Sequence, residues 1–158
     1  MPGTADVEPA TAAPQVEFHT GVGDVLAFAC RLLRKACRQG VRVAVTAAPA
    51  TLRELDRALW TFDERDFVPH ASVSGASAER AAERLAPIWL LPGPLPAGHP
   101  GVLVNLGADV EGIAGRFERL IEVVGADAAE AERGRARWRQ YRSRGWAVRH
   151  HAPDAGGS

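Results

Sequence analysis

The 158-residue chain has few of the residues that define secreted, membrane or disulfide-rich proteins. Its two cysteines, Cys30 and Cys37, are too few for a disulfide framework, and their spacing within a helical pattern favours a reduced protein. No apolar run reaches the length of a membrane span, and residues 1–15 lack the basic and apolar regions of a secretory signal. We therefore expect a cytoplasmic globular protein.

An excess of charge of either sign is also missing, because 19 lysine and arginine residues balance 19 acidic residues. This balance argues against a protein that binds polyanions over its whole surface. The basic residues are nearly all arginine, and Lys35 is the only lysine. Where arginines gather, their planar guanidinium groups favour two-pronged contacts with carboxylates.

The sequence lacks motifs for catalysis or cofactor binding. Residues 21–23 (GVG) precede a helix, but Leu26 stands where a dinucleotide-binding fingerprint has its third glycine. There is no phosphate-binding loop, and no serine lies in a nucleophile-elbow pattern. None of the five histidines is spaced from Cys, Asp or Glu as metal ligands are, although His150 and His151 are adjacent. We expect no catalytic residue, no cofactor and no metal site.

Short apolar strands and amphipathic helices alternate along the chain. This order predicts one α/β domain over residues 16–150, with a mostly parallel sheet and helices on both faces. Residues 1–15 are expected to form a disordered arm and residues 151–158 a flexible tail. Apolar side chains at helical spacing after Asp109, which can cap a helix, predict the third of four helices. The expected strands are 16–19, 41–46, 88–91, 102–106 and 146–149, and the expected helices are 23–39, 49–60, 110–124 and 128–144.

The strongest local charge lies between residues 131 and 151, where seven arginines oppose one glutamate. The rest of the chain carries the balancing negative charge, so a molecule with one basic end is expected. Helical spacing places four side chains on one face: Arg135, Trp138, Arg139 and Arg142. Three guanidinium groups around an indole suit an anionic and hydrophobic ligand, such as an acidic peptide with an aromatic end. The alternative is a solvated helix face with Trp138 turned into the core.

A second group of large apolar residues surrounds a proline that interrupts a regular strand. Its members are Trp60, Phe67, Val68 and Pro69. Some of these side chains are expected in the core. Any part that stays exposed would form a protein interface.

The basic helix around Trp138 and the apolar group around Trp60 both lie in segments that resemble one known family. Residues 55–60 (LDRALW), followed by residues 67–70 (FVPH), resemble the signature of the chi subunit of bacterial DNA polymerase III holoenzyme. Residues 135–142 (RARWRQYR) are similar to the last helix of that family. The resemblance extends from about residue 16 to residue 150. It implies a Rossmann-like sheet and a non-catalytic accessory subunit of the clamp loader.

The resemblance also implies two protein partners. One is the acidic, phenylalanine-ended C-terminal tail of single-stranded DNA-binding protein. The positions that match its binding helix are Arg135, Trp138 and Arg139, with Arg142 adjacent on the same face. The other partner is the psi subunit, which links chi to the clamp-loader ATPase. The positions that match its segment are Trp60, Phe67, Val68 and Pro69. Contact with DNA would then be mainly indirect.

Three alternatives stay open from the sequence. The arginine helix would bind single-stranded DNA directly if its partner were a nucleic acid. The surface around Trp60 and Phe67 would equally serve another DNA enzyme, such as a repair helicase. An α/β fold also permits a nucleotide-binding enzyme, although the missing phosphate motif and the missing acid/base pair count against it.

Overall fold

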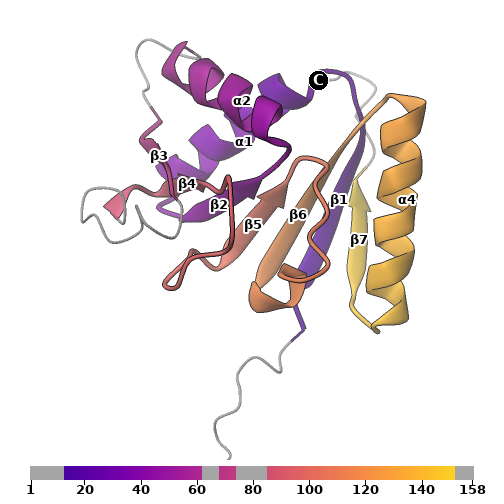
Figure 1. Cartoon of the computed structure of the whole chain (residues 1–158). Coiled ribbons are helices and arrows are strands. Elements are labelled where there is room, and N and C mark those ends of the chain that lie inside the picture. Colours follow the sequence, from indigo (N-terminus) through magenta and orange to yellow (C-terminus); the bar gives the residue numbers. More distant parts are fainter. Residues whose placement is uncertain (1–12, 62–67, 74–84, 152–158) are drawn as a thin grey trace, which may run out of the picture.

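The structure is a computed structural model that describes residues 13–61, 68–73 and 85–151 (Figure 1). These residues form a seven-stranded sheet in the order β3-β4-β2-β5-β6-β1-β7, and every pairing is parallel. The strands are β1 (Gln15–Val22), β2 (Val43–Thr46), β3 (His70–Ser72), β4 (Ile88–Leu90), β5 (Val102–Asn105), β6 (Arg119–Gly125) and β7 (Val148–His151). The helices are α1 (Val25–Arg38), α2 (Pro49–Thr61) and α4 (Ala128–Ser143), with a 3-10 turn η4 (Ala114–Arg116).

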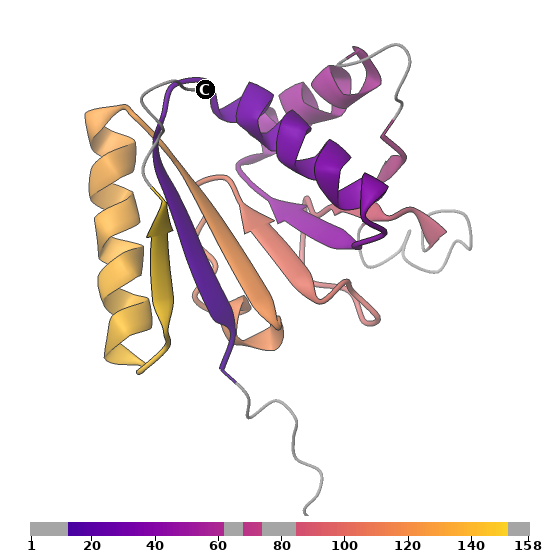
Figure 2. The same cartoon turned by 180° about the vertical axis from the view of Figure 1, so that it is seen from behind.

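The helices cover both faces of the sheet, which confirms the α/β architecture expected from the sequence (Figures 1 and 2). Alternate residues of β6 show the two layers, because successive side chains of a strand point to opposite faces. Ile121 and Val123 pack into the core under α1 and α2. Leu120 and Val124 pack into the core that includes residues of α4. Within the described ranges, no helix is long and apolar enough to cross a membrane.

Helix α1 follows directly from its sequence. Asp24 caps its first turn by accepting a 3.0 Å hydrogen bond from the backbone N–H of Ala27. Ala29, Cys30 and Leu33 are its buried residues and fall at helical spacing. The carboxylate of Asp24 thus satisfies one of the free backbone N–H groups at the start of α1.

The expected helix over residues 110–124 is wrong. Only η4 is helical there, and Arg119–Gly125 form strand β6. This strand lies inside the sheet between β5 and β1, and helices cover both of its faces, so apolar side chains occur on both sides of it. Apolar residues on both sides of a strand also include positions at helical spacing, so periodicity alone did not distinguish a strand from a helix.

The other expected elements are present with shifted ends. β1 is longer than the expected strand 16–19 because it pairs with β6 on one side and β7 on the other. β2 starts two residues later than expected, and β7 runs over Val148–His151 instead of 146–149. The expected arm and tail lie mostly at residues 1–12 and 152–158, which are outside the described residues.

Candidate functional site

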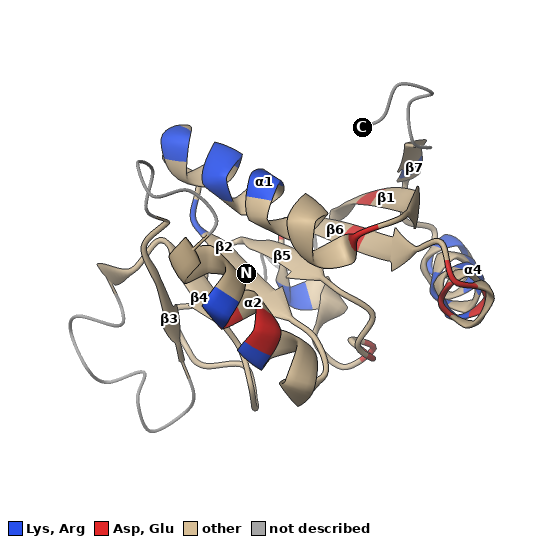
Figure 3. Ribbon diagram, turned by 90° about the horizontal axis from the view of Figure 1, so that it is seen from above, with Lys and Arg blue, Asp and Glu red and all other residues tan. Residues whose placement is uncertain are grey.

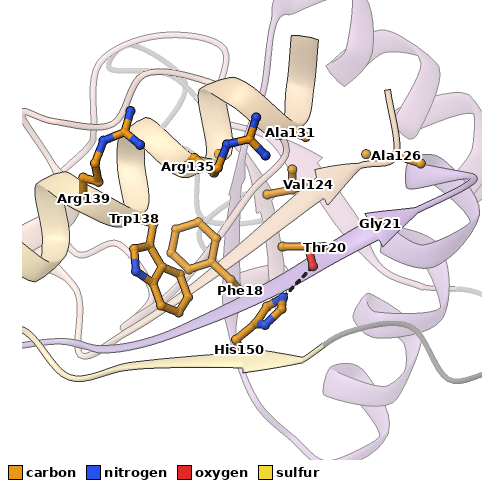
Figure 4. Close-up of a pocket in the computed structure, with 12 residues that line it drawn as sticks. Phe18, Thr20, Gly21, Val124, Ala126, Ala131, Arg135, Trp138, Arg139 and His150 are labelled. Carbon is orange, nitrogen blue, oxygen red and sulfur yellow. Dashed lines mark hydrogen bonds between the residues drawn. The ribbon is translucent and has the colours of Figure 1, made fainter. Parts of the chain in front are cut away.

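A pocket of about 560 Å³ lies where the carboxyl ends of β1 and β6 meet the first part of α4 (Figure 4). Ligands of parallel α/β sheets usually bind outside the carboxyl ends of the strands. The strands contribute Phe18, Thr20, Val124 and His150 to the lining, and α4 contributes Arg135, Trp138 and Arg139. The structure therefore brings three of the four predicted residues of the basic helix to one cavity.

Aromatic rings form the inner wall of this pocket. The half-buried ring of Trp138 packs edge-on against Phe18, with centroids 5.2 Å apart. It also meets the ring of His150 edge-on at 5.9 Å. His150 is held in turn, because its Nε2 lies 2.6 Å from the hydroxyl oxygen of Thr20. Trp138 is thus neither fully in the core nor fully solvated, and it offers an apolar surface to a ligand.

Arginines stand at the mouth of the pocket. The side chains of Arg135 and Arg139 are 62% and 65% exposed. Arg135 donates a 2.6 Å hydrogen bond to Glu132, and Arg139 lies 3.9 Å from the same carboxylate. This hydrogen bond and the charge of Arg135 hold the pKa of Glu132 below its usual value. Two guanidinium groups therefore share one exposed carboxylate. Their remaining N–H donors can form hydrogen bonds with further anionic groups.

Arg142 does not line the pocket, although helical spacing puts it on the same face. The physical reason is distance along the helix axis. Seven residues separate it from Arg135, which corresponds to about 10 Å of helix. Arg142 is exposed beyond the pocket and contributes charge to its surroundings.

A buried carboxylate fixes α4 on the sheet, and the sequence analysis missed it. Glu122 of β6 is fully buried and accepts hydrogen bonds from Tyr141 Oη at 2.6 Å and Arg137 Nε at 2.9 Å. Asn105 of β5 donates to both carboxylate oxygens, at 3.0 and 3.1 Å. Burial raises the pKa of Glu122, and these donors only partly offset that effect. Residues 122 and 137 belong to different elements, so spacing along the chain gave no sign of this network.

Close packing of α4 depends on a residue without a side chain. A Cβ atom at Gly134 would lie 2.9 Å from Cγ1 of Val124. Glycine at this position therefore lets the helix approach β6. Because Val124 and Gly134 both line the pocket, this approach also sets its depth.

The second predicted surface is only partly exposed. Trp60 at the end of α2 is 60% exposed, and Pro69 is exposed as well. Val68 is 1% exposed and packs in the core under α1 and α2, so it supports this surface from within. Phe67 lies outside the described residues.

Residues 55–60 and 67–70, the two segments of the predicted family signature, meet in space. His70 Nε2 lies 2.8 Å from Asp56 Oδ1, and its Nδ1 lies 2.8 Å from the backbone oxygen of Val68. The ring of Trp60 also stands edge-on to that of His70, at 5.5 Å. The polar residues of both segments thus hold α2 against the start of β3 and position Trp60 at the surface.

The charge distribution differs from the expected single basic end. Besides α4, helix α1 carries a row of basic side chains and no acidic residue (Figure 3). These residues are Arg31, Arg34, Lys35 and Arg38. The balancing acidic residues are therefore spread over other elements, and the molecule has two basic regions.

The fold and the pocket define a small parallel α/β protein with a cavity that has an aromatic wall and arginines at its mouth. The comparison with protein families is more specific. The family model described as "DNA polymerase III chi subunit, HolC" matches residues 14–149. The chain therefore belongs to the DNA polymerase III chi subunit family, which confirms the resemblance found in the sequence.

Two relatives support this assignment. The chain is 37% identical to the DNA polymerase III subunit chi of Pseudomonas aeruginosa over 127 residues, which are 80% of this chain and 84% of the relative. It is 31% identical to the DNA polymerase III subunit chi of Haemophilus influenzae over 123 residues, which are 75% of this chain and 81% of the relative.

Proposed function

We propose that the chain is a non-catalytic, cytoplasmic adaptor of DNA replication that ties single-stranded DNA-binding protein to the clamp loader. One observation carries this proposal: Arg135 and Arg139 stand at the mouth of a pocket whose wall is the ring of Trp138. A site of this kind matches a peptide that ends in an aromatic residue and carries acidic side chains.

The binding mode follows from the chemistry of the pocket. The terminal phenylalanine ring of the tail packs against Trp138, which the buried Phe18 supports from behind, and the terminal carboxylate pairs with Arg135 and Arg139. Acidic residues further back in the peptide extend toward Arg142. Such a small interface supports an affinity on the order of micromolar. Several tails on one oligomeric DNA-coating protein would strengthen the attachment, and salt would weaken it.

The second partner would bind at the other end of the sheet. Trp60 and Pro69 are the exposed members of the segment that matches the psi-binding region, with Val68 packed behind them. An indole that is 60% exposed is typical of a protein interface. The pocket and the Trp60 surface lie on different elements, so one molecule has room for both partners at once.

Peptide binding tests the pocket. A fluorescently labelled acidic peptide ending in phenylalanine is titrated with the wild type, followed by fluorescence anisotropy at low and at physiological salt. We expect saturable binding that salt weakens. Arg139→Glu should reduce affinity at least tenfold, because it replaces a cation at the mouth by an anion. Trp138→Ala should reduce it through loss of the apolar wall.

Arg142→Glu is the matched control, since it makes the same charge change on the same helix outside the pocket. Its effect should be several-fold smaller than that of Arg139→Glu. Equal losses from both variants would mean that only overall charge matters. Absence of binding by the wild type would sink the proposed mode, and tight binding of a bare oligonucleotide at physiological salt would favour direct contact with single-stranded DNA.

The second surface is tested by capture of the cognate psi subunit. Trp60→Ala should abolish capture and leave the affinity for the tail peptide unchanged. Arg139→Glu should show the opposite pattern. If Trp60→Ala captures psi as the wild type does, this surface serves a different partner or none.

A further inference from the structure

Three side chains with metal-binding atoms gather on the face of the β1–β7 edge that points away from the pocket. Glu17 and His19 are two residues apart on β1, so both project to the same side of the sheet. His151 of β7 is the direct parallel partner of His19. One oxygen or nitrogen atom from each of the three residues lies within 4.8 Å of the others.

We propose that Glu17, His19 and His151 form a binding site for one divalent transition-metal ion, Zn²⁺ above all, that ties strand β7 to β1. The site is independent of the function proposed above, because none of the three residues lines the pocket. No metal site was expected from the sequence, because 132 positions separate His19 from His151 and the strand register brings them together.

The donor set fits zinc better than calcium or magnesium. Two imidazoles and one carboxylate are ligands that Zn²⁺ takes in three-residue sites, whereas Ca²⁺ and Mg²⁺ prefer oxygen atoms alone. His19 Nε2 and Glu17 Oε1 are 3.5 Å apart, close to the spacing of about 3.3 Å between two ligands of a tetrahedral zinc ion. His151 is exposed, and one of its ring nitrogens lies within 4.8 Å of the ligand atoms of the other two residues.

The surroundings prepare these groups for a cation. The side chain of His19 is only 22% exposed, and its ring packs against Phe28 of α1 with centroids 5.2 Å apart. The rings of His19 and His151 stack at 4.7 Å with an angle of 13° between them. This stacking and the pairing of the two strands hold both rings side by side at the edge of the sheet.

Arg119 competes with the metal, and its position limits the expected strength. Its Nη2 donates a 2.8 Å hydrogen bond to Oε2 of Glu17. The other oxygen, Oε1, faces His19 and stays available as a single-atom ligand. A guanidinium beside the carboxylate lowers affinity for a cation, so the site should bind more weakly than a closed structural zinc site with four ligands.

The ion would stabilise the attachment of the edge strand β7 to the sheet. β7 has four residues and, among the strands that the structure describes, pairs with β1 alone. His150, next to His151, projects to the opposite face and there contacts Thr20 and Trp138 in the pocket. A metal bond to His151 therefore holds the strand that supplies one wall of the pocket.

Calorimetry with ZnCl₂ and the full-length wild type tests the site. We expect one Zn²⁺ per chain and a rise of the melting temperature with added zinc. His19→Gln and His151→Gln should each weaken binding about tenfold or more and remove the thermal shift. Co²⁺ provides a spectroscopic check, because a site with these ligands should give visible absorption bands that His19→Gln loses.

Two further variants separate this site from fortuitous binding. His150→Gln removes the neighbouring histidine on the opposite face, and Cys37→Ser removes a thiol on α1. Both should bind Zn²⁺ as the wild type does. The proposal is overturned if the wild type binds no zinc, if His19→Gln binds as tightly as the wild type, or if either of these two variants abolishes binding.

Discussion

The hydroxyl of Tyr141 donates a 2.6 Å hydrogen bond to the fully buried carboxylate of Glu122, and this contact joins α4 to an interior strand of the sheet. Arg137 reaches the same carboxylate from one turn earlier in the helix. The two residues between them on the helix that line the pocket, Trp138 and Arg139, are thereby held in place. The position of the candidate site thus depends on a polar network beneath it.

Tyr141→Phe should lower the free energy of unfolding by about 1.5–3 kcal/mol, because the variant leaves a buried carboxylate without one of its donors. The aromatic ring and its stacking on Trp146 at 5.4 Å are retained, so the loss reports the hydroxyl. Urea unfolding at neutral pH measures it. A double-mutant cycle with Glu122→Gln should show strong coupling. Additive effects would mean that the hydrogen bond contributes little.

Glu122 should also give the stability a characteristic pH dependence. Burial raises its pKa above the usual value of 4.5, so the folded protein binds this proton more readily than the unfolded chain. Its contribution to stability is therefore full below pH 4.5 and is lost as the pH rises through the raised pKa. The stability advantage of the wild type over Glu122→Gln should be larger at pH 5 than at pH 8.

Urea unfolding of both proteins across this range measures the difference. Comparison with one variant cancels the contributions of the other titrating groups. A difference that grows toward pH 8 would show that Arg137 and Tyr141 lower the pKa of Glu122 more than burial raises it.

Sequence reasoning found the parts of the site that depend on local order. Helical spacing on α4 was enough to bring Arg135, Trp138 and Arg139 together, because a helix fixes its own geometry. It failed where position depends on another element. Arg142 has the right spacing but lies near the last turn of α4, away from the carboxyl ends of β1 and β6 that bound the pocket.

The larger errors have the same origin. Leu120 and Val124 occur at helical spacing, yet they belong to β6, which pairs with β5 and β1 and is covered by helices on both faces. Glu122 then lay on a wrongly assigned helix, and its partners Tyr141 and Arg137 could not be inferred. His19 and His151 likewise meet only through the register of β1 and β7. Contacts across the sheet leave no periodic trace in a single sequence.

Gly134→Ala should destabilise the protein and weaken peptide binding, although alanine is the better helix former by about 1 kcal/mol. The new Cβ would lie 2.9 Å from Cγ1 of Val124, so α4 must move away from β6. Overpacking of this kind costs about 1–3 kcal/mol. Thermal unfolding and peptide titration measure the two effects.

Val124→Ala removes the methyl groups that the new side chain would meet, and the double variant should recover much of the loss from Gly134→Ala. Gly112→Ala is the control, because a Cβ there meets nothing within 4 Å. If Gly134→Ala is as stable as the wild type, or if Val124→Ala gives no rescue, close approach of α4 to β6 does not limit the pocket.

Glu132→Gln should strengthen binding of the acidic tail peptide. In the free protein the carboxylate of Glu132 accepts a 2.6 Å hydrogen bond from Arg135 and lies 3.9 Å from Arg139, so it occupies the cations that the peptide needs. Removal of its charge should raise affinity about two- to fivefold at low salt, since exposed ion pairs are weak and easily exchanged. The gain should shrink at high salt.

Glu111→Gln makes the same change in charge near Arg144, away from the pocket, and should have a smaller effect. Weaker binding by Glu132→Gln would mean that this glutamate orients Arg135 for the ligand instead of competing with it.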